Sequence, residues 1–279
     1  MMGPKWGIKI TALLGLWPLV VLAQAPELKP YGVMHSVVKS VVDGDTLRLE
    51  NGLTVRLLDI NTPELPHENR AGQPLANEAK QALRAIVEGK PVAVQLGARV
   101  YDPYDRVLGH VFLNQGTNRW VNGGMVASGL AHVYTFPDNR VYGPELLALE
   151  DKARAQGYGL WALPRWSIRD ANTCCAETDM GRFVVVEGEV QQVARVGERT
   201  YLNFGRDWRT DFTVAIDKKN EKFFKPKAEK KSDKKAKKQP FNLNQYVGKR
   251  VRVRGIATPV NGTMVKVTHL EQIQIVGAK

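Results

Sequence analysis

Acidic residues and arginines gather in one short, otherwise apolar stretch, VVDGDTLRLENGLTVRLLDINTPEL, at residues 41–65. The residues that matter are Asp43, Asp45, Arg48, Arg56, Asp59 and Glu64. Like charges held this close repel one another unless a cation neutralises them. Carboxylate and amide oxygens suit Ca²⁺, whereas arginines suit a phosphate, because the planar guanidinium donates two parallel hydrogen bonds to its oxygens. The stretch therefore indicates chemistry on a phosphodiester.

A β-hairpin would bring these groups together. The dipeptide Asn51-Gly52 predicts a two-residue turn, which places Leu47 opposite Arg56. Because side chains two positions apart in a strand share a face, Asp43, Asp45 and Arg56 would then project to the same side. From spacing alone, a surface ion-pair network of little energetic weight explains the same pattern.

Three motifs follow one another along the chain: DGDT at residues 43–46, RLLDINTPE at 56–64 and YDPYDR at 101–106. In this order and at these separations they resemble the staphylococcal nuclease (thermonuclease) family, over residues 36–162. The resemblance implies a five-stranded barrel of oligonucleotide-binding (OB) type with helices. It also implies Ca²⁺-dependent hydrolysis of phosphodiester bonds in DNA and RNA that leaves 3′-phosphate ends.

The resemblance further implies a role for individual residues. Ca²⁺ would be held by Asp45, Asn61 and the carbonyl group of Thr62. The scissile phosphate would be held by Arg56 and Arg106, while Glu64 would position or deprotonate the attacking water. The family usually has a second aspartate where this chain has Asn61. Amides do serve as Ca²⁺ ligands, so this departure puts the affinity for the metal in question more than the activity.

Two tyrosines are candidates for contacts with a nucleotide. Tyr104 keeps an aromatic residue of the family's motif, beside Pro103, where the family often has a lysine. The family's later tyrosines align poorly with HVYTFPDN at residues 132–139, where Tyr134 and Phe136 are the aromatic candidates for stacking on a base. We therefore predict Tyr104 and Tyr134 as substrate-binding residues.

Strand and helix signals alternate around the motifs. Short segments rich in Val and Leu, bounded by Gly, Pro, Asn or Asp, predict strands at 36–42, 45–50, 53–60, 91–96 and 106–113. Apolar residues at helical spacing predict three helices, at 72–89, 118–129 and 143–157. Strands that surround a helix, with more helices after them, indicate an α+β domain.

A second domain follows an interdomain linker, which we place at residues 163–181 because both periodicities are lost there. Residues 182–279 carry strand signals alone, including a hairpin turn at Asn261-Gly262, and predict an all-β, OB-like barrel. The segment 218–238, rich in lysine, is predicted to be an exposed loop.

The second domain offers candidate contacts to nucleic acid. Arg250, Arg252 and Arg254 alternate along one strand and so share a face. Together with aromatic residues they would make a basic groove with stacking platforms. Packing in the barrel explains the same aromatic residues equally well; they are Tyr201, Phe204 and Trp208.

The chain begins with a pattern typical of an export signal. Two lysines, an apolar run and small residues fill positions 1–25, as in a secretory signal peptide. We expect export to the periplasm or the medium and no stable membrane span after cleavage, with an uncleaved membrane tether as the alternative. The neighbours Cys174 and Cys175 are expected to be linker thiols or to contact another chain, because adjacent cysteines bridge only with strain.

Charge and motifs together favour an enzyme that acts on polyanions. The formal net charge of +12 favours nucleic acid over other partners, and we predict no obligate protein partner. The sequence predicts an exported, Ca²⁺-dependent nuclease that acts on DNA and RNA. The alternatives are a nucleic-acid-binding protein that has lost activity and an adhesin that uses the basic loop.

Overall fold

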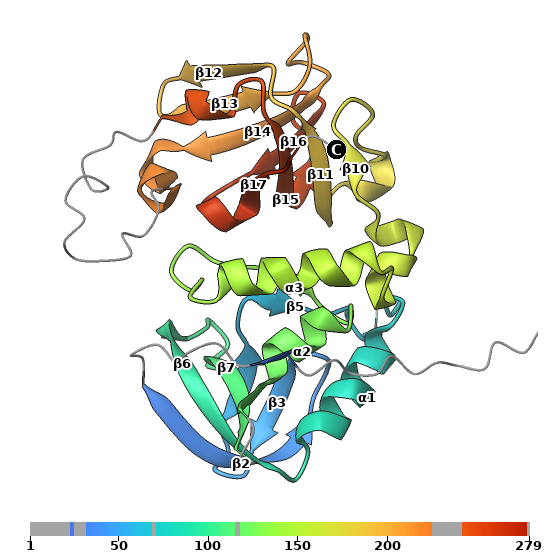
Figure 1. Ribbon diagram of the computed structural model, residues 1–279, viewed down its shortest axis with the longest axis vertical. Helices are drawn as coiled ribbons and strands as arrows, with labels where there is room; N and C mark the ends of the chain where they lie inside the picture. Colours follow the sequence, from blue (N-terminus) through green and yellow to red (C-terminus); the bar gives the residue numbers. More distant parts are fainter. Residues whose placement is uncertain (1–22, 25–31, 69–70, 115–117, 225–241, 278–279) are drawn as a thin grey trace, which may run out of the picture.

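The computed structural model describes residues 23–24, 32–68, 71–114, 118–224 and 242–277. Two lobes are stacked along the long axis, with a helix lying at the level where they meet (Figure 1). Within the described residues, no helix combines the length and the apolar character needed to cross a bilayer. The predicted signal peptide lies almost entirely outside the described residues.

The first lobe is a closed barrel. Its five strands pair in the order β7-β4-β3-β2-β6, and β6 pairs back with β7. They are β2 (Val33–Val41), β3 (Thr46–Leu49), β4 (Thr54–Leu57), β6 (Pro91–Tyr101) and β7 (Val107–Asn114). The alternation of apolar and polar residues sends one side of each strand into the core. The predicted five-stranded barrel is confirmed.

Four short strands complete this lobe. β1 (Ala23–Gln24) pairs with β8 (Asn118–Trp120), which continues from β7. β5 (Ile60–Asn61) pairs with β9 (His132–Val133) and forms a separate two-stranded sheet. This small sheet matters for function because it contains Asn61, one of the predicted metal ligands.

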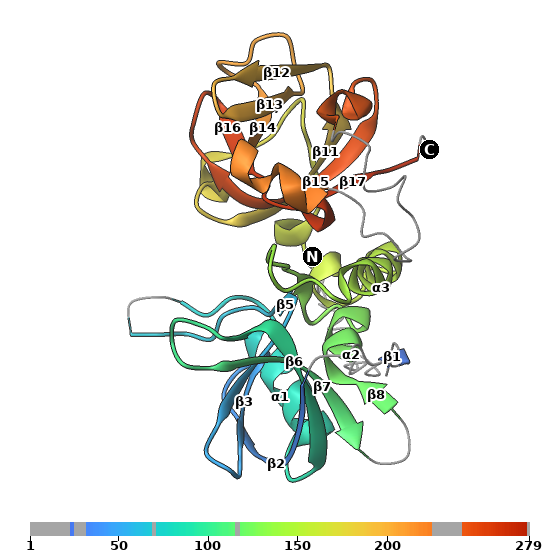
Figure 2. The ribbon, with the colours of Figure 1, turned by 90° about the vertical axis from the view of Figure 1, so that its left-hand side faces the viewer.

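Three helices cover the barrel, as predicted: α1 (Ala76–Val87), α2 (Val121–Ala127) and α3 (Gly143–Ala155). α1 buries its apolar stripe, Ala79, Leu83 and Ile86 included, in the core. α2 is buried along its whole length. α3 lies where the two lobes meet in both views (Figures 1 and 2), so its two sides face different domains.

The predicted register of the first hairpin is wrong by one residue. Leu47 pairs with Val55, and Arg56 pairs with Thr46. The predicted register would have placed Leu47 beside Arg56, on one face. Because a shift by one residue moves every side chain to the opposite face, burial of leucine and valine on the core side selects the observed pairing. The turn accommodates it with a three-residue loop, in which Gly52 takes a φ of 86°.

The second lobe consists, in its described part, of strands and 3₁₀ turns. Its strand path runs β10-β11-β15-β16-β14-β13-β12, and β17 pairs with β15. The strands are β10 (Arg169–Asp170), β11 (Phe183–Glu189), β12 (Gln192–Val196), β13 (Arg199–Asn203), β14 (Phe212–Asp217), β15 (Arg250–Thr258), β16 (Thr263–Lys266) and β17 (Ile273–Ile275). The predicted hairpin at Asn261-Gly262 joins β15 to β16, and both residues have positive φ.

Short 3₁₀ helices fill the connections: η1 (Gly159–Ala162), η2 (Pro164–Trp166), η3 (Glu177–Asp179), η4 (Lys218–Phe224), η5 (Leu243–Tyr246) and η6 (Leu270–Gln272). Within the predicted lysine loop, residues 218–224 form η4, and the rest lies outside the described residues. Two of these helices and β10 lie in the predicted linker. Residues 163–181 are therefore structured, and β10 pairs with β11 of the second lobe.

The expectation that the two cysteines are thiols is wrong. The structure joins Cys174 and Cys175 in a disulfide bond. Both side chains pack against the core of the second lobe. Both are partly buried there, and a contact with another chain stays a prediction.

Candidate active site

Asp45 lies in the bend between β2 and β3 and is largely buried. Its Oδ2 accepts hydrogen bonds from the backbone N–H and the hydroxyl group of Thr62, at 2.9 and 3.0 Å. Its Oδ1 accepts a hydrogen bond from the Thr46 hydroxyl group at 3.2 Å. These bonds tie two segments that are distant in sequence, so Asp45 and Thr62 meet as the sequence predicted.

Arg56 lies on β4 and links the predicted metal ligands to one another. Its Nη2 lies 3.1 Å from Asp45 Oδ2 and 2.9 Å from Asn61 Oδ1. Its Nη1 donates to the backbone carbonyls of Leu57 and Ile60. Two predicted ligand oxygens thus converge on one positively charged nitrogen.

The donor set fits a hard divalent cation. Within the described ranges, no three His, Cys, Asp or Glu side chains come together in a way that would hold a metal ion, so a cation here would depend on amide and carbonyl oxygens as well as on Asp45. Asn61 Nδ2 donates to the Thr62 carbonyl at 3.3 Å, which places that oxygen beside the Asn61 side chain. All three are hard oxygen donors of the kind that Ca²⁺ accepts.

Asp43 adds negative charge next to Asp45. Burial raises the pKa of the Asp43 carboxyl group above its ordinary value, and the neighbouring charge of Asp45 raises this pKa further. Its Oδ1 accepts a hydrogen bond from the Asp45 backbone N–H at 3.0 Å, which keeps the two acids side by side. The two carboxylates repel each other when both are ionised, and a bound cation would relieve that repulsion.

Glu64 is exposed at the surface next to this cluster. Two hydrogen bonds to Gln73 hold the backbone of Glu64. The Glu64 N–H donates to the side-chain oxygen of Gln73 at 3.2 Å, and the Gln73 N–H donates to the Glu64 carbonyl at 2.8 Å. The backbone is held while the carboxylate faces solvent. This arrangement suits a group that must reach a water molecule.

Arg106 stands immediately before β7, the strand next to Arg56. β4 and β7 are parallel, with Arg56 opposite Leu108. The part assigned to the Arg106 guanidinium in this site stays a prediction.

Asp102 holds Arg106 in place. Its Oδ1 accepts the backbone N–H groups of Tyr104 and Arg106, and its Oδ2 accepts Arg106 Nε at 2.7 Å. Burial alone would raise the pKa of Asp102, but the hydrogen bonds and the charge of Arg106 lower it below the ordinary value. Asp102 stands inside the YDPYDR motif, but no role was predicted for it.

The two predicted tyrosines differ in their surroundings. Tyr104 is 79% exposed, with the Arg106 guanidinium 5.6 Å from the centre of its ring. Tyr134 is only partly exposed and packs against Phe136 and Phe183, the latter from the second lobe. Tyr104 is therefore open to a ligand, whereas Tyr134 also belongs to the contact between the lobes.

Two arginines of β15 pair with acids of α3. Arg254 is buried and lies 2.7 Å from Glu150, and Arg252 pairs with Asp151 at the same distance. Only Arg250 is exposed at its position on the strand. The predicted contact to nucleic acid does not fit Arg254 while the lobes stay together, because its guanidinium is enclosed by protein.

One acid of the opening stretch serves the core. The Asp59 side chain is buried, and its Oδ2 lies 3.3 Å from Nε2 of His110. The other ring nitrogen of His110, Nδ1, accepts a hydrogen bond from Trp120. The left-handed conformation of Asp59, with φ of 62°, turns the carboxylate away from Asp45. Nothing in the residue types distinguished this aspartate from the others.

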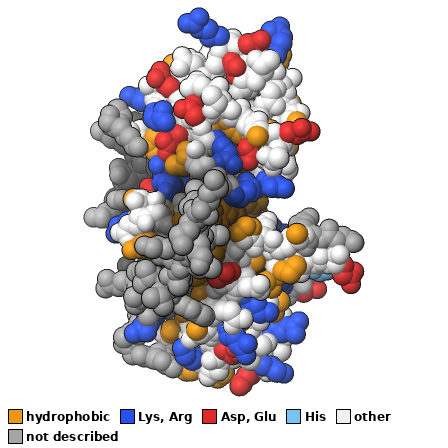
Figure 3. All heavy atoms as spheres, turned by 90° about the vertical axis from the view of Figure 1, so that its right-hand side faces the viewer, with side chains coloured by type: hydrophobic (Ala, Val, Ile, Leu, Met, Phe, Trp, Pro, Cys, Tyr) orange, Lys and Arg blue, Asp and Glu red, His pale blue; other side chains and the backbone are white. Residues whose placement is uncertain are grey.

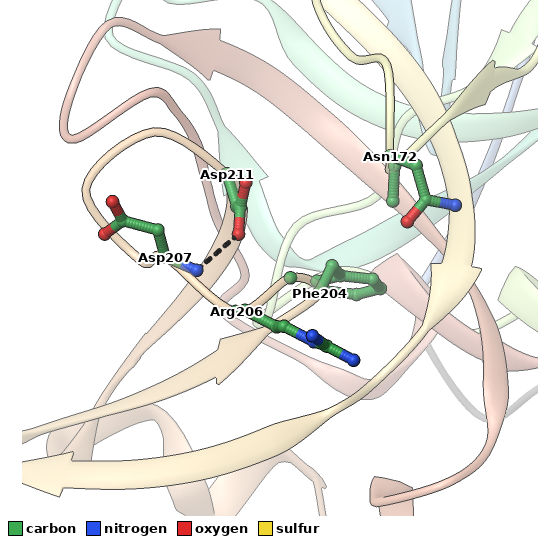
Figure 4. A pocket seen from close by; sticks show the side chains of 7 residues that line it. Asn172, Phe204, Arg206, Asp207 and Asp211 are labelled. Carbon is green, nitrogen blue, oxygen red and sulfur yellow. Dashed lines mark hydrogen bonds between the residues drawn. The ribbon is translucent and has the colours of Figure 1, made fainter.

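A hollow of about 280 Å³ lies on the second lobe, away from these residues (Figure 4). Phe204 and Arg206 line it, with Asn172 across from them. Asp207 and Asp211 close one end, where the Asp207 backbone N–H donates to Asp211 Oδ2. No motif in the sequence predicted this hollow. Asp207 and Asp211 stabilise the turn in which they lie.

Comparison with known proteins covers most of the candidate site, although Asp43 and Asp45 precede the residues that the family model matches. Residues 54–163 match the family described as staphylococcal nuclease homologues. The chain is 34% identical over 140 residues to Protein ParB of Escherichia coli, covering 47% of this chain and 74% of that protein.

Relatives named as endonucleases are also similar. The probable endonuclease LCL3 of Phaeosphaeria nodorum is 34% identical over 136 residues, which is 47% of this chain and 45% of that protein. Endonuclease YhcR of Bacillus subtilis is 31% identical over 142 residues, which is 47% of this chain but 12% of the much longer relative. The chain thus spans less than half of each of these two proteins.

Proposed function

We propose that this chain, which belongs to the family of staphylococcal nuclease homologues, hydrolyses phosphodiester bonds of DNA and RNA and leaves 3′-phosphate ends. The observation that carries the proposal is the convergence of Asp45 and Asn61 on Arg56, with Arg106 directly before the neighbouring strand β7. A site for nucleic acid alone would not need the buried acids beside the phosphate-binding arginines.

The side chains divide the work of an in-line attack. Arg56 and Arg106 bind the phosphate oxygens and stabilise the charge that grows on them in the transition state. Glu64 orients a water molecule and accepts its proton as the oxygen bonds to phosphorus. The bond from phosphorus to the 5′-oxygen breaks, and that oxygen leaves with a proton from solvent.

Ca²⁺ is the proposed cofactor. Asp45, Asn61 and the Thr62 carbonyl would hold it, with Asp43 nearby as a further negative charge. When bound, it would supply positive charge that polarises the phosphate. Arg56 pairs with Asp45, so the guanidinium would belong to the charge balance of the site as well as binding phosphate.

The second lobe is proposed as an OB-like module that holds single-stranded substrate. A groove of about 430 Å³ crosses β12, β13, β14 and β16. Tyr201 and Trp208 line it, together with Arg199, whereas Phe204 is buried in the core and is unsuited to stacking. Trp208 is exposed and Tyr201 is half-buried, and accessible aromatic rings beside an arginine suit unpaired bases. Export of the protein, based on residues 1–25, is part of the same proposal.

Digestion of DNA and RNA tests the proposal. The wild-type protein should cut both with Ca²⁺ and neither with a calcium chelator, and the product ends should lose phosphate to a 3′-phosphatase. Glu64→Gln and Arg106→Ala should each lower kcat by about 10²- to 10³-fold. Cutting that is equal in all three proteins would refute the site. Binding of nucleic acid without cutting by the wild type would favour an inactive binding protein.

A further inference from the structure

Glu150 on α3 connects the two lobes. Both of its side-chain oxygens are buried and each faces a different lobe. Oε1 accepts the backbone N–H of Val133 on β9 at 2.7 Å. Oε2 lies 2.7 Å from Arg254 Nη1 on β15, a close ion pair in which neither side chain is more than 1% exposed. α3 lies between the barrel and the sheet that contains β15 (Figure 1).

The strand held by Glu150 is the partner of the predicted metal-binding strand. β9 pairs with β5, so that Val133 lies opposite Ile60 and His132 opposite Asn61. The Tyr134 N–H donates to the Asp59 carbonyl at 2.9 Å and extends this pairing. Because each strand of this sheet has only two residues, its position depends on the groups that hold it from outside.

Other contacts from the second lobe reach the same segment. The ring of His132 lies 4.2 Å from that of Phe183, between centroids. The Thr135 hydroxyl lies 2.7 Å from His269 Nε2. On the face in Figure 3, basic and hydrophobic side chains gather near the level where the lobes meet. The second lobe therefore packs against residues 132–135 with both apolar and polar contacts.

From these contacts we propose that Arg254 is a positioning residue for the nuclease site. Its guanidinium pairs with Glu150, as does that of Arg154 one turn along α3, and holds the carboxylate against the Val133 N–H. β9 in turn fixes β5, which contains Asn61 and precedes Thr62. The proposal rests on the proposed function only in that these residues bind a cation. The second lobe would thus set the affinity for Ca²⁺ in addition to holding substrate.

Two double variants separate this role from the general stability of the interface. Arg254→Met with Glu150→Gln removes both charges but keeps an amide oxygen that can accept the Val133 N–H. Arg254→Met with Glu150→Met removes the charges and the acceptor. Arg154, which lies 3.7 Å from Glu150 Oε2, keeps its pair with Asp151 in both variants. Neither variant therefore leaves an unpaired buried charge, so both should fold. Arg250→Met is the matched control, because Arg250 stands on the same face of β15 but is exposed.

The first readout is independent of catalysis. Amide hydrogen exchange of Val133, Tyr134 and Thr62 should accelerate in the Met/Met variant and stay near wild type in the Met/Gln variant and the control. Calorimetric titration with Ca²⁺ and a non-hydrolysable nucleotide should show a dissociation constant about tenfold higher in the Met/Met variant alone. At saturating Ca²⁺, kcat should remain close to that of the wild type.

Equal exchange rates in the two double variants would overturn the proposal, whatever the protein does with nucleic acid. Equal Ca²⁺ affinities, with unequal exchange, would also overturn it, because the strand would then move without affecting the ligands. If the wild type neither binds Ca²⁺ nor cuts nucleic acid, the proposed function fails, and the exchange rates still decide whether Arg254 holds β9 through Glu150.

Discussion

Arginines meet carboxylates in two regions of this molecule, and the surroundings differ. At the end of the barrel, Arg56 and Arg106 are partly exposed, at 16% and 31% of their side-chain surface, and Asp43 remains as an extra acid. Between the lobes, Arg254 and Glu150 are enclosed, and Arg252 is shared by Asp151 and Glu187.

The difference shows how one type of ion pair serves two purposes. A buried pair contributes little net stability when intact, but the loss of one partner leaves a charge without solvent or a counter-ion. A partly exposed pair can exchange its partner for a ligand at small cost, because water screens the separated charges. The first region is therefore suited to binding and the second to holding the lobes together.

Removal of one partner from the buried pair should give the largest effect. Glu150→Ala leaves Arg254 unpaired and should lower the free energy of unfolding by about 3–5 kcal/mol, measured by urea denaturation. Asp138→Ala is the control, since the pair of Asp138 with Arg99 is half exposed and should change stability by about 0–1 kcal/mol. Equal losses would erase the contrast between buried and exposed pairs.

Substitution of Arg106 in the barrel site should change the catalytic rate more than the stability of the fold. Arg106→Ala should reduce kcat by about 10²- to 10³-fold, which is about 2.7–4 kcal/mol in the barrier, while the melting temperature changes little. Steady-state kinetics and a thermal melt on the same sample measure both. Arg106→Lys keeps the charge without the planar fork and should recover only part of the rate. A stability loss comparable to that of Glu150→Ala would contradict the assignment.

Acid should weaken the region between the lobes. Burial lowers the pKa of His132 and of His269 to about 3, from an ordinary value of 6.5. In the unfolded chain both take up a proton below about pH 6.5, whereas in the folded chain they do not. Stability conferred by the neutral histidines is thus complete above pH 6.5 and falls by about 1.4 kcal/mol per pH unit and histidine between pH 6.5 and 3.

Urea denaturation between pH 7 and pH 4.5 measures this slope. His132→Phe removes one titrating group whose two ring nitrogens have no hydrogen-bond partner among the described residues, and should flatten the dependence. His35→Gln, at an exposed position, should not. An unchanged slope in His132→Phe would show that this side chain takes up a proton in the folded state.

The two regions also differ in how far the sequence could predict them. The residues of the barrel site lie in one hairpin and the loop that follows it, in motifs that resemble those of a known family, so Asp45, Arg56, Asn61 and Thr62 could be predicted together. The pair of Glu150 and Arg254 joins residues that are far apart in the chain. Their side chains meet only through packing of two domains, and no local pattern contains that information.

Turns show the same limit at a smaller scale. Asn51-Gly52 and Asn261-Gly262 are the same dipeptide, yet both residues have positive φ only at the second site. At the first, the pairing of Leu47 with Val55 in the core outweighed the preference for a two-residue turn. The dipeptide predicted that a hairpin forms there, and the burial of the strands decided its register.

The smallest expected change is also the one that most directly contrasts the regions. Asp43→Asn keeps the acceptor for the Asp45 N–H and removes one of two repelling charges. Since burial and Asp45 raise the pKa of Asp43, its ionised form destabilises the fold at neutral pH, and this variant should gain about 0.5 kcal/mol in unfolding free energy. It should bind Ca²⁺ more weakly. Loss of the Asp43 charge would thus stabilise the fold, whereas loss of the Glu150 charge would destabilise it. A variant that is both less stable and unchanged in Ca²⁺ affinity would show that Asp43 is an ordinary structural acid.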